Sequence, residues 1–294
     1  MKLRANGIEL EWESFGDPSA PALLLIAGLG AQLVRWEDEF CERLAGCGQR
    51  VIRYDNRDVG LSSRLDAAEA PDAAAAMAAA RGESLRVPYL LDDMADDAAG
   101  LLDALGLATA HVVGRSMGGM IAQALAIRHA SRVATLTSIM SSTGAPDLPP
   151  PKPEAAALLV ERLAPGREAH IEREVRGVRV TGGSGFPIEE ERVARRAARE
   201  YDRGFYPEGT NRQLLAIVAS GSRRRALEST RIPTLVVHGS DDPLVLLEHG
   251  VDTARAVPGA KLEIIEGMGH HLPSAVWPRL VDAIAKHAQN GRPA

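Results

Sequence analysis

Short apolar runs alternate along the chain with longer segments in which apolar residues recur at helical spacing. Most of the short runs are rich in Val, Ile and Leu and are bounded by Gly, Pro or charged residues, a pattern typical of buried strands. Strands are predicted at residues 2–5, 8–14, 22–27, 49–54, 110–114, 133–139, 234–239 and 262–265. Residues 87–105 carry leucine, methionine and alanine at helical spacing up to Gly106, which predicts a long amphipathic helix.

The order of these elements predicts an α/β fold with a mostly parallel, eight-stranded sheet and helices on both faces. The first two strands are an exception, because they flank Asn6 and Gly7, a signal for an antiparallel hairpin. Shorter helices are predicted at residues 36–44 and 246–256, and another runs from the strand at 110–114 toward Ile127.

This alternation stops at a proline-rich segment, with five prolines between residues 146 and 153. From there to about residue 229 the chain is rich in Arg and Glu and has no buried-strand run. Helices are predicted in this part at residues 153–163, 167–178, 188–203 and 207–220. We therefore predict a first core part at 1–144, a helical lid at 145–229 that shapes the substrate pocket, and a second core part at 230–294.

Composition narrows the class of protein without identifying it. The 294 residues are 45% hydrophobic and 25% charged, which is typical of a globular protein rather than a disordered or fibrous one. The formal net charge is −5 and basic residues are scattered, so we expect no nucleic-acid partner. No segment approaches the roughly 18 apolar residues of a membrane span, and no secretory pattern follows Met1, so we expect a cytoplasmic protein without a membrane partner.

Cys41 and Cys47 are the two cysteines of the chain. Their spacing matches neither a Cys-x-x-Cys motif nor a zinc site. Because disulfides are unusual in a reducing compartment, we expect two buried or half-buried free thiols.

Residues 114–118 read Gly-Arg-Ser-Met-Gly and lie between a predicted strand and a predicted Ala-rich helix. This pattern is typical of a nucleophile elbow, a sharp strand-to-helix turn with a serine at its apex. Gly114 and Gly118 lack side chains that would collide where strand and helix cross, and Ser116 is expected to adopt a strained backbone conformation. The alternative is a glycine-rich turn with an incidental serine, which becomes the weaker interpretation once partner residues are found.

A second glycine pair, Gly28 and Gly30, follows the apolar run at residues 22–27. A dinucleotide-binding fingerprint would need a glycine at the position of Leu33, so that interpretation fails. We instead predict a loop whose backbone N–H groups face the site, because an elbow serine needs one N–H donor from such a loop.

Two further loops carry residues that we interpret as structural. Residues 55–62 are rich in charge, and we expect Asp55, Arg57 and Asp58 to brace this loop rather than to act in catalysis. Residues 181–185 read Thr-Gly-Gly-Ser-Gly but lack the Lys-Ser/Thr of a phosphate-binding loop, so we interpret them as a hinge between lid helices. The Ala-rich stretch at residues 67–81 is expected to be a surface excursion.

Two strand-end loops supply further polar groups. The strand at 234–239 is followed by Asp241 and Asp242, and the strand at 262–265 is followed by His270 and His271. Because the carboxyl ends of parallel strands lie at the same edge of a sheet, we expect an acid and a histidine beside Ser116.

The chain order of serine, acid and histidine resembles that of the α/β-hydrolase superfamily, which implies the α/β-hydrolase fold. The resemblance covers essentially the whole chain and is closest to serine carboxylesterases of the aclacinomycin-methylesterase type. It is carried by Leu-Leu-Leu-Ile at 23–26, Val-Ile-Arg-Tyr-Asp at 51–55, the elbow, and Gly-Met-Gly-His-His-Leu-Pro at 267–273. Ala27 stands where many relatives have a histidine, and the lid has no clear counterpart, so the resemblance does not specify the substrate.

The resemblance also chooses between neighbouring candidates. The Gly-x-x-Asp register after the strand selects Asp242 over Asp241, which is interpreted as a loop-capping or solvated neighbour. The glycine directly before His270 selects that histidine over His271, which is expected to point the other way. His238 is interpreted as a structural residue at the end of its strand.

In such a triad, Ser116 is the nucleophile, His270 is the general base and Asp242 orients the imidazole. The oxyanion hole is expected from the backbone N–H groups of Leu29 and Met117. This chemistry requires neither a metal ion nor an organic cofactor.

These roles predict a serine carboxylic-ester hydrolase that acts on a small or medium apolar ester, such as a methyl ester or a lactone. Two alternatives stay open: a cofactor-free haloperoxidase, perhydrolase or other acyl transferase on the same triad, and a non-catalytic ligand receptor with this fold. Epoxide and haloalkane hydrolysis are disfavoured because the apex residue is Ser116 rather than an aspartate. The expected partner is a small-molecule ester, and formation of a homo-oligomer stays open.

Overall fold

The computed structural model describes residues 1–66, 87–161 and 165–291 and is built around an eight-stranded sheet. The strand order is β1-β2-β4-β3-β5-β6-β7-β8. The strands are β1 (Lys2–Ala5), β2 (Ile8–Phe15), β3 (Ala22–Ile26), β4 (Arg50–Tyr54), β5 (Ala110–Arg115), β6 (Val133–Ile139), β7 (Thr234–Gly239) and β8 (Lys261–Ile265). Pairing is antiparallel for β1 with β2 and for β2 with β4, and parallel for every later pair, which confirms the predicted fold class.

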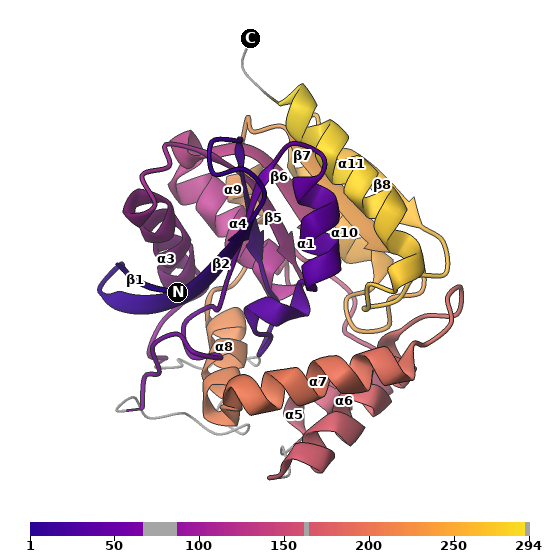
Figure 1. The fold of residues 1–294 in the computed structure, drawn as a ribbon. Coiled ribbons are helices and arrows are strands. Elements are labelled where there is room, and N and C mark those ends of the chain that lie inside the picture. The colour runs from indigo at the N-terminus through magenta and orange to yellow at the C-terminus, as the bar shows by residue number, and fades with distance from the viewer. Residues whose placement is uncertain (67–86, 162–164, 292–294) are drawn as a thin grey trace.

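Alternate residues of β3 pack against helices on opposite faces of the sheet. Leu24 and Ile26 belong to a buried cluster with α3 (Leu91–Ala104) and α4 (Met117–Arg128). Leu23 and Leu25 belong to a second cluster with α1 (Asp38–Ala45) and α11 (Trp277–Asn290). Side chains of a strand alternate between its two faces, so a continuous apolar run is what a doubly covered central strand requires (Figure 1).

Several helices differ from their predicted bounds. The helix expected at 87–105 begins at Leu91, because Leu90 is extended and donates its N–H to the Asp93 side chain at 2.7 Å, which caps the helix there. The helix expected at 36–44 is α1, which begins two residues later, and a 3₁₀ turn, η1 (Leu33–Arg35), precedes it. Helix α11 was not predicted, although its buried residues recur at helical spacing. The predicted excursion at 67–81 lies outside the described residues.

Other segments agree with the sequence more closely. Cys41 is buried and Cys47 is half-buried, and both are free thiols, as predicted. The shorter elements α9 (Arg224–Leu227), α10 (Leu247–Ala256), η2 (Ala130–Arg132) and η3 (Ser274–Val276) connect the later strands. Within the described ranges, every helix is too short or too polar to cross a membrane.

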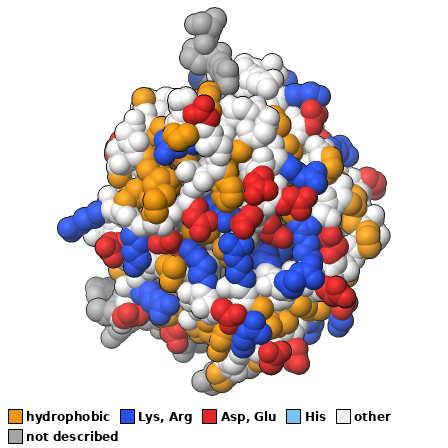
Figure 2. Space-filling view, in the orientation of Figure 1, with side chains coloured by type: hydrophobic (Ala, Val, Ile, Leu, Met, Phe, Trp, Pro, Cys, Tyr) orange, Lys and Arg blue, Asp and Glu red, His pale blue; other side chains and the backbone are white. Residues whose placement is uncertain are grey.

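Four of the helices between β6 and β7 are grouped beyond one end of the sheet (Figure 1). They are α5 (Pro153–Val160), α6 (Arg167–Thr181), α7 (Glu190–Gly204) and α8 (Pro207–Ala219), close to the predicted ranges. Figure 2 shows a band of acidic and basic side chains across the face where α7 meets the rest of the molecule. Arg192 of α7 contacts Glu37 at 2.8 Å and Arg199 contacts Asp38 at 3.1 Å, so part of this band links α7 to the segment around α1.

The turn from β5 into α4 positions Ser116. The backbone of Ser116 has φ 53° and ψ −125°, a conformation that residues other than glycine rarely adopt. A Cβ on Gly114 would lie 2.1 Å from the Gly118 carbonyl oxygen, and a Cβ on Gly118 would lie 2.1 Å from the Ile26 carbonyl oxygen. The close crossing of strand and helix is therefore possible only with glycine at both positions, as the motif predicted.

We predict that Gly118→Ala lowers the free energy of unfolding by about 3 kcal/mol, because the new methyl group must push α4 away from β3. Urea unfolding followed by circular dichroism would measure the change.

Gly177→Ala is the matched control, since Gly177 lies within α6 and a Cβ there would have no neighbour within 4 Å. Helix propensity alone then predicts a gain of up to about 1 kcal/mol. Equal unfolding free energies for Gly118→Ala and the unmodified protein would contradict the steric explanation.

Candidate active site

Three side chains from distant parts of the sequence form a continuous hydrogen-bonded chain. Ser116 lies at the end of β5, Asp242 follows β7 and His270 follows β8. Nδ1 of His270 donates to Oδ2 of Asp242 at 2.7 Å, which leaves Nε2 to accept the Ser116 hydroxyl proton at an N···O distance of 3.0 Å. The structure therefore brings together the three side chains that the sequence predicted to lie at one site.

The carboxylate of Asp242 is fixed by the backbone of its own loop. Its side chain is fully buried, and Oδ1 accepts the N–H groups of Leu244 and Val245, both at 2.9 Å. Asp241 turns away and accepts hydrogen bonds from Ser184 and Ser240. The two neighbouring aspartates thus have different surroundings, and Asp242 is the one that contacts the imidazole.

The loop that carries His270 is held by the segment at residues 181–185. The His270 N–H donates to the Thr181 carbonyl at 2.6 Å, and the Gly269 N–H donates to the Gly182 carbonyl at 3.0 Å. Gly185 donates in the other direction, to the Gly267 carbonyl at 2.9 Å. The sequence predicts a hinge at this glycine-rich stretch but does not predict its contacts with the histidine loop. Backbone pairing between two irregular segments leaves no periodic signal in the sequence.

The loop after β3 lies against Ser116. A Cβ on Gly28 would lie 3.2 Å from the Cβ of Ser116. The Gly30 N–H is taken by Gln213 Oε1 at 2.8 Å, whereas the Leu29 N–H has no protein acceptor among the described residues. Met117 is the first residue of α4, where N–H groups have no acceptor within the helix. The expected donors, Leu29 and Met117, therefore lie in the two segments that flank Ser116.

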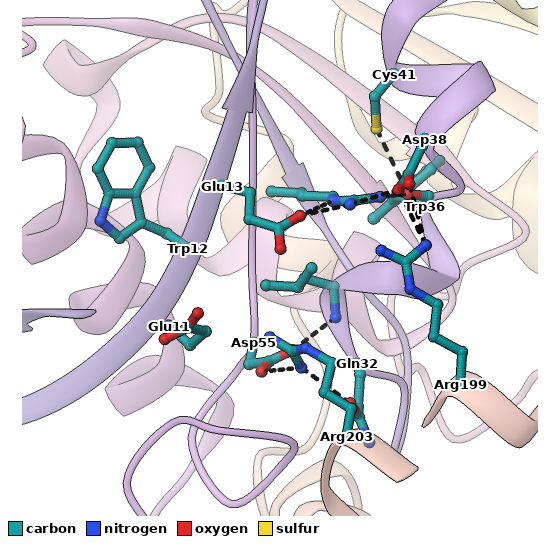
Figure 3. A network of polar contacts seen from close by, with 12 residues as sticks. Glu11, Trp12, Glu13, Gln32, Trp36, Asp38, Cys41, Asp55, Arg199 and Arg203 are labelled. Atoms are coloured by element: carbon teal, nitrogen blue, oxygen red, sulfur yellow. Dashed lines mark hydrogen bonds and ion pairs between the residues drawn. The ribbon is translucent and has the colours of Figure 1, made fainter. Parts of the chain in front are cut away.

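Asp55 anchors the end of this loop, as Figure 3 shows. It is fully buried and accepts the Leu33 N–H at 2.6 Å, the Leu61 N–H at 2.9 Å and Nη1 of Arg203 at 2.5 Å. Burial raises the pKa of Asp55, while Arg203 and the two N–H groups act against that rise. The Asp55 carboxylate thus links the segment that follows the loop after β3 to α7.

The bracing predicted for residues 55–62 is present, but its partners come from elsewhere in the chain. Arg57 binds Asp97 of α3 with two hydrogen bonds of 2.6 and 2.7 Å. Asp58 binds Arg212 of α8 at 2.8 and 3.0 Å. The charges of this loop therefore attach it to helices on two sides instead of pairing with each other.

A cavity of about 380 Å³ opens beside Ser116 and His270. Much of its wall is apolar and comes from helices α4 to α8: Met120, Leu158, Leu159, Phe205, Leu214 and Ile217. Another part of the wall is charged and contains Arg35, Arg115, Glu174 and Glu200. His271 also lines this cavity, so the expectation that it points away from the site was wrong.

The charged wall is organised by Arg35. Its guanidinium binds both oxygens of Glu200 at 2.6 Å and contacts Glu174 at 2.7 Å. Burial alone would raise the pKa of Glu174, but the nearby charges of Arg35 and other arginines outweigh it and lower the pKa to about 2. Glu174 is therefore ionised at neutral pH, and α6 and α7 are both tied to η1.

The other histidines lie outside this hydrogen-bonded chain. His238 is fully buried and donates from Nε2 to the Val245 carbonyl at 2.7 Å, beside Asp242 at 3.7 Å. His170 lines the cavity and packs edge-on against Phe205. Neither contacts Ser116, which agrees with the interpretation of His238 as a structural residue.

Comparison with known proteins supplies independent information. A profile of the alpha/beta hydrolase fold family matches residues 21–273. The chain is 34% identical to rhodomycin D methylesterase DauP from Streptomyces sp. (strain C5), with 94% of each chain covered. Among solved structures, a meta-cleavage product hydrolase from Pseudomonas fluorescens IP01 has a TM-score of 0.79 at 19% identity, covering 99% of this chain and 98% of that chain. The enol-lactonase from Burkholderia xenovorans LB400 has a TM-score of 0.71 at 25% identity, covering 99% of both chains.

We predict that Glu174→Gln lowers the free energy of unfolding at pH 6 by on the order of 1–3 kcal/mol and by less at pH 3. The lowered pKa of Glu174 in the folded protein means that its ionised form stabilises the fold above the ordinary pKa of 4.5, and that this stabilisation is lost as the pH falls toward 2. Urea unfolding of both proteins at the two pH values would measure the difference, and a constant difference would contradict the prediction.

Proposed function

Because this chain belongs to the alpha/beta hydrolase fold family and is an ester-hydrolysing enzyme, we propose that it cleaves carboxylic esters through Ser116, His270 and Asp242. The observation that supports this most directly is the hydrogen-bonded chain from the Ser116 hydroxyl through the His270 imidazole to the Asp242 carboxylate. The methylesterase that matches most of the chain is named for the same class of reaction.

The first half of the reaction forms an acyl-enzyme. A serine hydroxyl is a weak nucleophile at neutral pH, so His270 Nε2 accepts the proton as Ser116 Oγ attacks the ester carbonyl carbon. Asp242 then stabilises the imidazolium through the bond at Nδ1 and keeps the ring in the required tautomer. As the tetrahedral intermediate collapses, His270 gives the proton to the departing alcohol oxygen.

The negative oxygen of the intermediate needs donors that are in place beforehand. The N–H groups of Leu29 and Met117 are the ones we assign, since both flank Ser116 and neither requires a side chain. In comparable sites each such donor contributes about 3 kcal/mol of transition-state stabilisation.

The second half of the reaction repeats these steps with water. His270 removes a proton from water, hydroxide attacks the acyl carbon, and Ser116 leaves with the proton returned by His270. The acid is released and the serine is restored, so this sequence needs no metal ion or organic cofactor.

The cavity supports a small or medium ester with an apolar portion. Leucine and isoleucine side chains of α5 and α8, with Phe205 from the turn between α7 and α8, form much of its apolar wall. We propose that residues 145–229 act as the lid that selects the substrate, and that a methyl ester or a lactone is cleaved, in line with the names of the matching methylesterase and enol-lactonase.

We predict that Ser116→Ala lowers kcat for a p-nitrophenyl ester by about 10³-fold or more, because the attacking oxygen is removed. The same variant should no longer be labelled by a fluorophosphonate probe, which reacts covalently with an activated serine. Release of p-nitrophenolate and mass spectrometry of the labelled protein would measure the two effects.

Ser229→Ala is the matched control, because Ser229 is exposed and lies outside the cavity lining. It should retain both activity and labelling. Undiminished turnover by folded Ser116→Ala would refute the assignment of the nucleophile, and a wild-type protein that neither hydrolyses esters nor reacts with the probe would favour a non-catalytic receptor.

A further inference from the structure

Arg115, the residue directly before the nucleophile, places a cation in the wall of the cavity. Its guanidinium lies over the Trp36 ring, 5.9 Å from the ring centre. In the part of the chain that the structure describes, no carboxylate oxygen lies within ion-pair distance of it. Arg115 is therefore a charged group beside the reacting serine without a counter-ion from the protein.

Other arginines of the buried interior behave differently. Arg53 binds Glu13 and Asp38, Arg57 binds Asp97, and Arg212 binds Asp58. Such pairing is the general rule, because a buried charge without a partner carries a large desolvation penalty. Arg223 also has no carboxylate partner, but it donates hydrogen bonds to Gln123 and to two backbone carbonyls. Arg115 has neither kind of partner among the described residues, so its charge needs a reason beyond structural support.

The carboxylates nearest to this region are already engaged. Glu200 and Glu174 are held by Arg35 at 2.6 and 2.7 Å. Glu37 is shared between Arg192 at 2.8 Å and Arg196 at 3.6 Å. These carboxylates are paired with other arginines, so none of them forms an ion pair with Arg115.

His271 is a second polar side chain in this part of the cavity. It is buried, it lines the cavity, and it has no hydrogen-bond partner among the described residues. Burial and the nearby charges of Arg196, Arg115 and Arg35 hold the pKa of His271 well below its ordinary value. Its imidazole is therefore neutral at pH 7 and offers one free N–H donor.

The guanidinium of Arg115 keeps its positive charge in this position. Burial, together with Arg35 and Arg196, lowers the pKa of Arg115 to about 9, so the guanidinium remains cationic at neutral pH. An anion placed beside it would gain from a charge-assisted bond in a poorly solvated site.

We propose that Arg115 and His271 form a subsite for a carboxylate group of the substrate, so that the preferred esters carry a free carboxylate. This inference rests on the proposed function, because it places the carboxylate within a short spacer of the carbonyl attacked by Ser116. The Cα atoms of Arg115 and Ser116 are about 3.8 Å apart, so the reach of the arginine side chain sets the spacer, and the spacer length is the variable of the test. A monoanion suits the subsite better than a dianion, because Glu174 and Glu200 lie in the same cavity wall.

The test compares pairs of methyl esters of equal shape. Monomethyl succinate, glutarate and adipate are each measured against the neutral methyl ester in which an isopropyl group replaces the carboxylate. We expect kcat/KM of the wild-type enzyme to favour the charged member by about 10-fold or more for at least one spacer length, as one charge-assisted contact would give. The neutral member measures ester hydrolysis alone.

Arg115→Met keeps most of the side-chain length and removes the charge. The ratio of kcat/KM for the charged and neutral esters should then fall by about 10- to 100-fold. Arg195→Met is the matched control, because Arg195 is exposed, pairs with Glu191 on the same helix, and should leave the ratio unchanged. Arg115→Gln is a second variant in case Arg115→Met does not fold, and the wild-type ratio requires no variant.

The outcomes separate this inference from the proposed function. Hydrolysis of the neutral esters without preference for the charged ones, and with the same ratio in Arg115→Met, overturns the carboxylate subsite and leaves the esterase intact. If no ester is hydrolysed, the proposed function fails, and calorimetric titration with the uncleaved monoanions monomethyl succinate, glutarate and adipate decides the subsite. Binding that weakens about 10-fold or more in Arg115→Met supports the subsite, and absent or unchanged binding overturns it.

Discussion

The close contact between β5, α4 and β3 is the constraint on which the arrangement of the site depends. Glycine at 114 and 118 lets the helix approach two strands at distances that no Cβ would tolerate, and Ser116 is forced into a positive φ at the point of crossing. This geometry places the serine hydroxyl above the sheet edge, the first N–H groups of α4 next to it, and the loop after β3 against its Cβ. The positions of the proposed nucleophile and of both proposed oxyanion donors therefore follow from one packing contact.

Ionic contacts attach the remaining parts to this centre. Asp55 links the loop after β3 to α7 through Arg203, and Arg35 links η1 to α6 and α7 through two glutamates. These pairs are mostly buried, so their value lies less in net stability than in fixing one arrangement of helices over the sheet. The apolar core supplies the stability of the sheet, and the charged contacts determine how the cavity above it is closed.

The sequence predicted the sheet, the hairpin, the elbow and the family because each has a local signal: an apolar run, a two-residue turn, a glycine pattern or a characteristic motif. The bounds of α3 were predicted less well, since the cap at Leu90 depends on one side-chain contact from Asp93. Which charged residues pair with each other, and which side chains face the cavity, could not be predicted from the sequence. Arg57 pairs with Asp97 and not with Asp55 or Asp58, and His271 faces the cavity, because both outcomes depend on long-range packing that leaves no trace in a short window.

The backbone contacts between residues 181–185 and the histidine loop make the imidazole mechanically dependent on α6. Thr181 is the last residue of that helix, and its carbonyl holds the N–H of His270 directly. A displacement of the C-terminal end of α6 would consequently move the backbone of His270, the proposed general base, without passing through any side chain. Substrates that shift α6 on entering the cavity would tune the alignment of the proton relay, which couples the fit of the substrate to the rate of its chemistry.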